Sequence, residues 1–286
     1  MFLSLKTLIV FLLFSINSIQ SMEGLTTYTL ELAKKYNIRI DNRLPKKELS
    51  FYIQCKSTVL KEKNFSYNKL HSQSIIGAIY KKCNLLDDAK REYNNLILFC
   101  DEIIKDPQKA IEESNYKWLP HRAYCIKMRA YGHLGEYDKA LNTAKEFYQV
   151  YPFSQFYLNV KAAELEVLLE KGDYEKVLQE ADFVIKYFPK CRMKPDEYIS
   201  YRKDVDAGVC EPFDDGGKFI ALDAMAKAYE KSGKKEEMKE TLKSLLALYE
   251  KYNYENMQDE IKDIKEKLHI NTSGCCGSVK LKDSKK

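Results

Sequence analysis

A short sequence pattern occurs twice in this chain at a constant spacing. LGEYDKALNTAKEFYQVYP begins at Leu134, and EKGDYEKVLQEADFVIKYFP begins at Glu170. A glycine, a tyrosine and a proline each recur 37 residues later, as the pairs Gly135/Gly172, Tyr137/Tyr174 and Pro152/Pro189. Glycine suits a tight turn between helices, and proline ends a unit because it cannot continue a helix. The pattern therefore predicts repeated helical hairpins.

The residues around these glycines resemble the tetratricopeptide repeat (TPR), a helix-turn-helix unit of about 34 residues. Ala140 matches the small residue of the second helix. An earlier copy has Asn84 in place of the turn glycine, and Asn tolerates positive φ. A later, weaker copy keeps Gly233 but has Lys235 where the aromatic residue is expected. The resemblance implies an all-α fold, a right-handed TPR superhelix (α-solenoid) with repeats at about 70–101, 118–152, 153–189 and 218–252.

The remaining segments fit around this array, which with its cap spans residues 70–270. Residues 22–69 predict two helices separated by Pro45 that pack on the first repeat. An extra short helix should open at Pro107 and stop before Pro120. Residues 190–217 form an insertion bounded by Pro189 and the pair Gly216–Gly217. A charged segment at 254–269 places Met257, Ile261, Ile264 and Leu268 on one stripe, as expected of a capping helix.

The two ends of the chain differ from its middle. Residues 1–21 carry Lys6, an apolar run from Thr7 to Ile16 and then small polar residues, the layout of a cleaved signal peptide. No cysteine precedes Cys55, so no lipid-accepting cysteine is available at the cleavage site. Residues 271–286 lack periodicity and predict a disordered basic tail. We therefore expect an exported protein, with membrane contact at most peripheral.

Charge and motif content exclude several function classes. The chain has 47 Lys and Arg against 42 Asp and Glu, well interspersed, so we expect no nucleic-acid partner. It has no phosphate-binding glycine loop, nucleophile elbow or zinc-protease helix motif. His121 and Cys125 share a helical face, but a tetrahedral zinc site needs at least three protein ligands, and no third is at suitable spacing. We expect no catalytic residues, no metal and no cofactor, and hence a protein that is not an enzyme.

The eight cysteines leave one candidate disulfide. Cys55, Cys83, Cys100 and Cys125 fall within helical patterns, where a free buried thiol is common. Cys275 and Cys276 are adjacent in the tail. Cys191 and Cys210 stand near the two ends of the insertion, and a bridge between them would stabilise it by about 3 kcal/mol. We predict that bridge if the protein is exported.

The predicted array leaves its first helices lining a groove for a protein or peptide partner. The known carboxylate-binding TPR subclass uses Lys and Asn at positions that here hold Ser74 and Ala78, so that activity is not implied. The groove-facing candidates have mixed charge and are Lys81, Lys82, Arg129, His133, Glu166, Glu170 and Lys227. Cations in the first two repeats followed by acids would suit a bipolar peptide, although a plain solvated face explains them equally well.

A narrower resemblance rests on the 37-residue spacing, the export signal and the YPFSQFY and YFPK joints. Together they resemble periplasmic TPR proteins of Gram-negative envelopes, of the outer-membrane β-barrel assembly (BamD/YfiO) and CpoB types. This resemblance covers mainly residues 118–189 and implies a scaffold that holds a barrel-assembly component or unfolded outer-membrane proteins, in the periplasm. The alternative is a secreted or lumenal eukaryotic interaction protein, for which Asn64 and Asn271 stand in glycosylation triplets.

Overall fold

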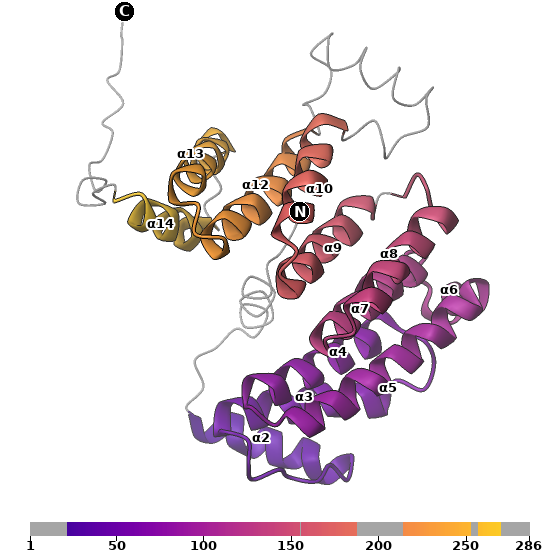
Figure 1. The fold of residues 1–286 in the computed structure, drawn as a ribbon. Helices are drawn as coiled ribbons and strands as arrows, with labels where there is room; N and C mark the ends of the chain where they lie inside the picture. Colours follow the sequence, from indigo (N-terminus) through magenta and orange to yellow (C-terminus); the bar gives the residue numbers. More distant parts are fainter. Residues whose placement is uncertain (1–21, 155, 188–213, 253–256, 270–286) are drawn as a thin grey trace, which may run out of the picture. The chain divides into compact units, whose positions relative to one another are not determined.

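A computed structural model describes residues 22–154, 156–187, 214–252 and 257–269 (Figure 1). These residues form α-helices and no strand, which confirms the predicted all-α class. They fall into two compact units, with described residues 22–173 in the first and 174–187, 214–252 and 257–269 in the second. The predicted signal peptide, the cysteines Cys191 and Cys210 and the tail at 271–286 lie outside the described residues.

The described part of the first unit consists of helices that follow one another along the chain. They are α2 (Met22–Lys35), α3 (Lys46–Lys61), α4 (Tyr67–Lys82), α5 (Leu86–Lys105), α6 (Pro107–Ser114), α7 (Leu119–His133), α8 (Tyr137–Val150) and α9 (Tyr157–Lys171). Helices α4 and α5, and likewise α7 and α8, are packed pairs joined by short turns. The first predicted repeat is thus longer than 70–101, because α4 begins at Tyr67 and α5 runs to Lys105.

The predicted turn residues all adopt left-handed backbone conformations. The φ angles are 57° at Asn84, 74° at Gly135, 81° at Gly172 and 75° at Gly233. In each turn the next amide donates to the carbonyl five residues back, at 2.9 to 3.0 Å, in the pairs Leu85–Tyr80, Glu136–Tyr131, Asp173–Leu168 and Lys234–Tyr229. This is the Schellman arrangement, which satisfies carbonyls at a helix end. The prediction that Asn84 replaces a turn glycine is confirmed.

Close packing between α4 and α5 depends on a glycine that the repeat pattern also marks. Gly77 faces the ring of Tyr93, and a Cβ atom added at Gly77 would lie 2.7 Å from that ring. The small residues predicted at the helix crossings are likewise buried, with Ala89 4% exposed and Ala140 fully buried. Small side chains here allow two backbones to approach while aromatic rings fill the space beside them.

The structure confirms one predicted boundary and corrects another. Helix α6 opens at Pro107 and stops before Pro120, as expected, and it ends at Ser114 because Asn115 takes the left-handed conformation with φ 51°. Pro120 lies instead in the first turn of α7, where the missing proline amide costs nothing. The insertion was expected to extend to Gly217, whereas α12 already begins at Asp214. Its glycine pair therefore lies inside the first helical turn, despite the weak helix propensity of glycine.

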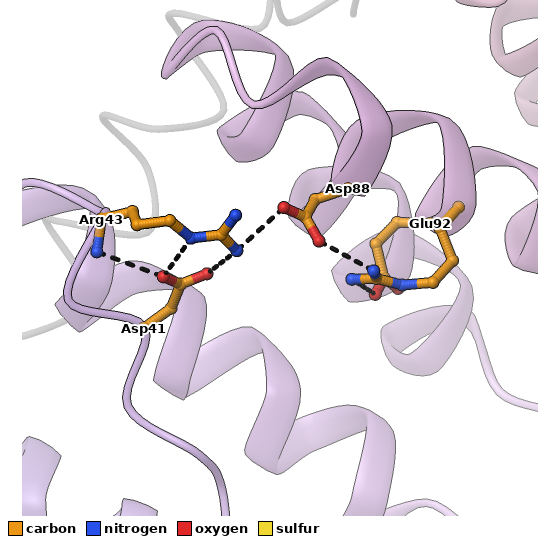
Figure 2. Close-up of polar contacts among 5 residues, drawn as sticks. Asp41, Arg43, Asp88 and Glu92 are labelled. Atoms are coloured by element: carbon orange, nitrogen blue, oxygen red, sulfur yellow. Dashed lines mark hydrogen bonds and ion pairs between the residues drawn. The ribbon is translucent and has the colours of Figure 1, made fainter.

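An ion-pair network joins the loop between α2 and α3 to α5 (Figure 2). The Arg43 guanidinium lies 2.7 Å from a carboxylate oxygen of Asp41 and 2.8 Å from one of Asp88. Arg91 reaches the other Asp88 oxygen at 2.8 Å and Glu92 at 3.6 Å. The hydrogen bonds from Arg43 hold the pKa of Asp41 below its usual value. The network therefore fixes the N-terminal helices against the first hairpin.

The second unit is built around a short apolar core. Its helices are α10 (Tyr174–Tyr187), α12 (Asp214–Lys231), α13 (Lys235–Tyr252) and α14 (Gln258–Lys267). Helix α12 packs on both α10 and α13, and α14 packs on α13. Ile261 and Ile264 are buried against Leu242, Leu245 and Tyr249 of α13. The predicted apolar stripe of the last helix is confirmed, and α14 covers apolar surface that α13 would otherwise expose.

Candidate functional site

Six of the seven predicted groove residues lie in the first unit, near the ends of α4, α7 and α9. Arg129 of α7 binds Glu166 of α9 with both arms of its guanidinium, through Nε at 2.9 Å and Nη2 at 3.4 Å. These two residues are 37 apart, which is the spacing of the sequence repeat. Residues separated by this spacing thus lie side by side on α7 and α9.

A second contact group lies one turn further along the same helices. The Lys81 ammonium of α4 donates to Nδ1 of His133 at 3.0 Å, and Glu170 of α9 lies 3.8 Å from the same nitrogen. Burial and the Lys81 charge lower the pKa of His133 to about 4. The imidazole is therefore neutral at pH 7, with Nδ1 as the acceptor and the proton on Nε2. His133 and Glu170 are again one period apart.

The other predicted residues do not join these groups. Lys82 turns to Glu48 of α3, with 2.7 Å between its ammonium and a carboxylate oxygen. Lys227 belongs to the second unit, where it pairs with Asp223 on its own helix at 2.6 Å. The structure thus brings together Lys81, His133 and Glu170, and separately Arg129 and Glu166. We call these five residues the ladder face.

On the ladder face Arg129 and Glu166 form an ion pair, Lys81 and Glu170 lie beside the neutral His133 ring, and the charged side chains remain accessible. Exposed fractions are 41% for the Arg129 side chain, 56% for Glu166 and 42% for Glu170. A bipolar peptide would meet Arg129 already held by Glu166, so its acid would have to exchange with that ion pair. Such pairs at a surface contribute about 0.2–1 kcal/mol each, so this exchange is energetically accessible.

Buried groups behind the ladder face position its side chains. The ring of Tyr93 packs 5.0 Å from the His133 ring, centroid to centroid, and burial raises the pKa of the Tyr93 phenol. Cys125 lies under Arg129, which donates to its sulfur at 3.5 Å. The sequence did not predict these supporting contacts or the role of Glu48. The signal that could have predicted the pairs Arg129–Glu166 and His133–Glu170 is the 37-residue spacing, which separates the two members of each pair.

Within the described residues, neither a metal-binding cluster nor a membrane-spanning helix is found. No three His, Cys, Asp or Glu side chains gather as a metal site there. His121 and Cys125, considered above as a half-site, are both buried, and His121 is surrounded by aromatic rings. Cys55, Cys83, Cys100 and Cys125 are free thiols, as predicted, although Cys83 is only partly buried. Among the described helices, none has the length and apolar character to cross a membrane.

Comparison with known proteins adds no assignment. No protein-family model matches the chain, and neither a curated protein nor a solved structure matches it.

Proposed function

We propose that this protein is a non-enzymatic scaffold whose ladder face binds a protein or peptide partner, and that its helical hairpins are TPR repeats forming an α-solenoid. The observation that supports this most is the meeting of Lys81, His133 and Glu170, which come from three successive first helices. A row of first helices is the surface on which repeat arrays of this kind hold extended segments.

The ladder face supplies specificity through exchangeable charges. A partner carboxylate can take the place of Glu166 on Arg129, while a partner cation takes up the released Glu166. Charged groups arranged in this way select partners and orient them more than they add affinity. The apolar contacts that a stable complex needs would come from the exposed parts of neighbouring helices.

We further propose that the protein works after export, in a bacterial envelope. The N-terminal apolar run and the resemblance of residues 118–189 to envelope TPR proteins support this compartment. They also make a barrel-assembly component or an unfolded outer-membrane protein the first partners to test. The eukaryotic lumenal alternative predicts occupied glycosylation at Asn64, which intact-mass measurement of the native protein distinguishes.

Charge reversal on the ladder face tests the proposed function. A partner is first captured from native envelope extract with the tagged full chain and identified, and its affinity for purified variants is then measured. Arg129→Glu should weaken binding about tenfold or more. Lys145→Glu, an exposed change of the same charge on α8, should leave affinity unchanged.

A charge swap separates recognition from stability. Arg129→Glu combined with Glu166→Arg restores the ion pair in reverse, so the double variant should recover thermal stability without recovering affinity. The proposal is wrong if Lys145→Glu weakens binding as much as Arg129→Glu, or if the swap variant binds like the wild type.

A further inference from the structure

The loop after α8 and the start of α7 enclose an open pocket of about 270 Å³. Its lining residues are Trp118, His121, Tyr151, Pro152, Phe153 and Ser154. The pocket is distinct from the ladder face, because His121 and His133 stand twelve residues apart on α7, about 18 Å along the helix. All of its lining residues belong to the first unit.

Five of the six lining residues carry a ring, and none of the six carries a charge at pH 7. The His121 ring centroid lies 4.0 Å from that of Tyr151 and 5.1 Å from that of Trp118. Burial lowers the pKa of His121 to about 4, so the imidazole is neutral at pH 7. Its Nδ1 atom is buried and has no hydrogen-bond partner. Phe153 remains 47% exposed, which leaves an apolar surface at the edge of the pocket.

The surroundings of this apolar pocket carry positive charge. The Lys117 ammonium lies 4.9 Å from the Trp118 ring, and the Arg122 guanidinium lies 4.8 Å from the ring of Phe156. Phe156 in turn packs 5.5 Å from Trp118. Within the described residues neither cation pairs with a carboxylate, although the Arg122 guanidinium also lies 5.7 Å from the ring of Tyr67, and the buried Nε of Arg122 lacks a hydrogen-bond partner. The N-terminal end of α7 adds the positive end of a helix dipole.

We infer that this pocket binds one apolar or aromatic side chain of a partner segment in which acidic residues flank that side chain. The volume lies just below the range of small-molecule sites, so it suits a single anchoring side chain. The unpaired Lys117 and Arg122 supply charge complementarity to the flanking acids. The inference rests on the proposed function because its occupant is a protein segment, and it adds the chemistry of that segment.

The only tryptophan of the chain, Trp118, lies in the pocket and reports on it directly. Its fluorescence in the full-length protein is followed during titration with the blocked peptides Ac-GDFDG-NH2, Ac-GDADG-NH2 and Ac-GKFKG-NH2. The first should cause a saturable change. The second should bind about tenfold or more weakly because the anchor is missing. The third should bind several-fold more weakly, and the difference between the two Phe peptides should shrink at high salt.

Variants of residues in and beside the pocket test whether the peptides bind there. Phe153→Ser, at a half-exposed position, should weaken Ac-GDFDG-NH2 binding about tenfold, and Lys117→Glu should remove the preference over Ac-GKFKG-NH2. The exposed control Lys145→Glu should change neither.

Several results would overturn the inference. They are the absence of a saturable change with Ac-GDFDG-NH2, equal binding of the alanine peptide, and preference for the lysine peptide. Concentration-dependent self-association that Phe153→Ser abolishes would show that a second copy fills the pocket. If the peptides fail while Arg129→Glu still weakens partner binding, only this inference is lost and the proposed function stands.

Discussion

Replacing His121 by Phe should make the protein less sensitive to mild acid. His121 is 9% exposed and packs among aromatic rings, and burial lowers its pKa from an ordinary 6.5 to about 4. The unfolded chain therefore takes up a proton at this position before the folded chain does. As pH falls from about 6.5 to 4, the free energy of unfolding must fall with it, and the loss levels off below pH 4.

The size of this effect follows from the pKa difference. Each pKa unit corresponds to about 1.4 kcal/mol, so the lowered pKa of His121 corresponds to a loss of about 3 kcal/mol between pH 6.5 and 4. Phe has a similar ring and no titrating group, so His121→Phe should remove this part of the pH dependence. At pH 7 the variant should be as stable as the wild type or slightly more so, because it removes the unpaired Nδ1.

Urea denaturation of the wild type and His121→Phe, measured from pH 7 to 4.5, tests this reasoning. The difference between their unfolding free energies cancels the acid sensitivity of carboxylates, which both proteins share. That difference should shift in favour of the variant as pH falls. A difference that stays constant across this range would show that His121 is not buried as described. His133→Gln is measured in the same way for comparison. The pKa of His133 is also lowered, but this side chain is more exposed than that of His121 and contacts Lys81.

Four further predictions follow from the packing and the sequence. Gly77→Ala should lower the free energy of unfolding by about 1–3 kcal/mol, because the added methyl group meets the Tyr93 ring. Gly135→Ala adds a methyl group in open space and should cost only roughly 1 kcal/mol, because of the positive φ at that position. Chemical denaturation of the two variants measures both values. Alkylation of the native protein should modify Cys83 before the buried thiols, and uniform rates would contradict this. Mass mapping of unreduced native protein should find Cys191 linked to Cys210, and free alkylation of both refutes that bridge. N-terminal sequencing should find the mature chain starting after residue 18 or 21, and an intact first residue excludes cleavage at those sites.

The regular part of the fold could be predicted because each turn leaves a local signal. Gly135, Gly172, Gly233 and even Asn84 mark backbone positions with positive φ, and that requirement is visible in the sequence. The end of α2 has the same backbone arrangement at Asn37, where Ile38 donates to Ala33 at 2.8 Å, but no repeat pattern drew attention to it.

The candidate site could be predicted only in part. The repeat pattern predicts which helix positions hold the groove residues, but it does not predict the ion pair of Arg129 with Glu166, although the two are 37 residues apart. Because Arg129 and Glu166 form an ion pair, two charges that were expected to be free for a peptide already bind each other. Glu48 and Arg43 could not be found this way, because they come from segments outside the repeat.

Sequence periodicity could not predict the aromatic pocket. The Trp118 ring packs on His121 and Phe156. Trp118 and Phe153 line the same pocket because of the path of the loop after α8. The repeat pattern predicts only that this loop contains a proline, Pro152, and does not predict its path. Tertiary contacts between the two segments decide that path.

Placement of a photo-crosslinking residue tests most directly whether the ladder face binds the partner. Benzoylphenylalanine is introduced singly at Glu166 or Glu170 on the ladder face, and at Lys90 or Lys145 on the second helices, all exposed positions. After irradiation with the identified partner, crosslinks should form from the ladder-face positions and be absent or weak from the other two. Crosslinks that form mainly from Lys90 and Lys145 would contradict the account.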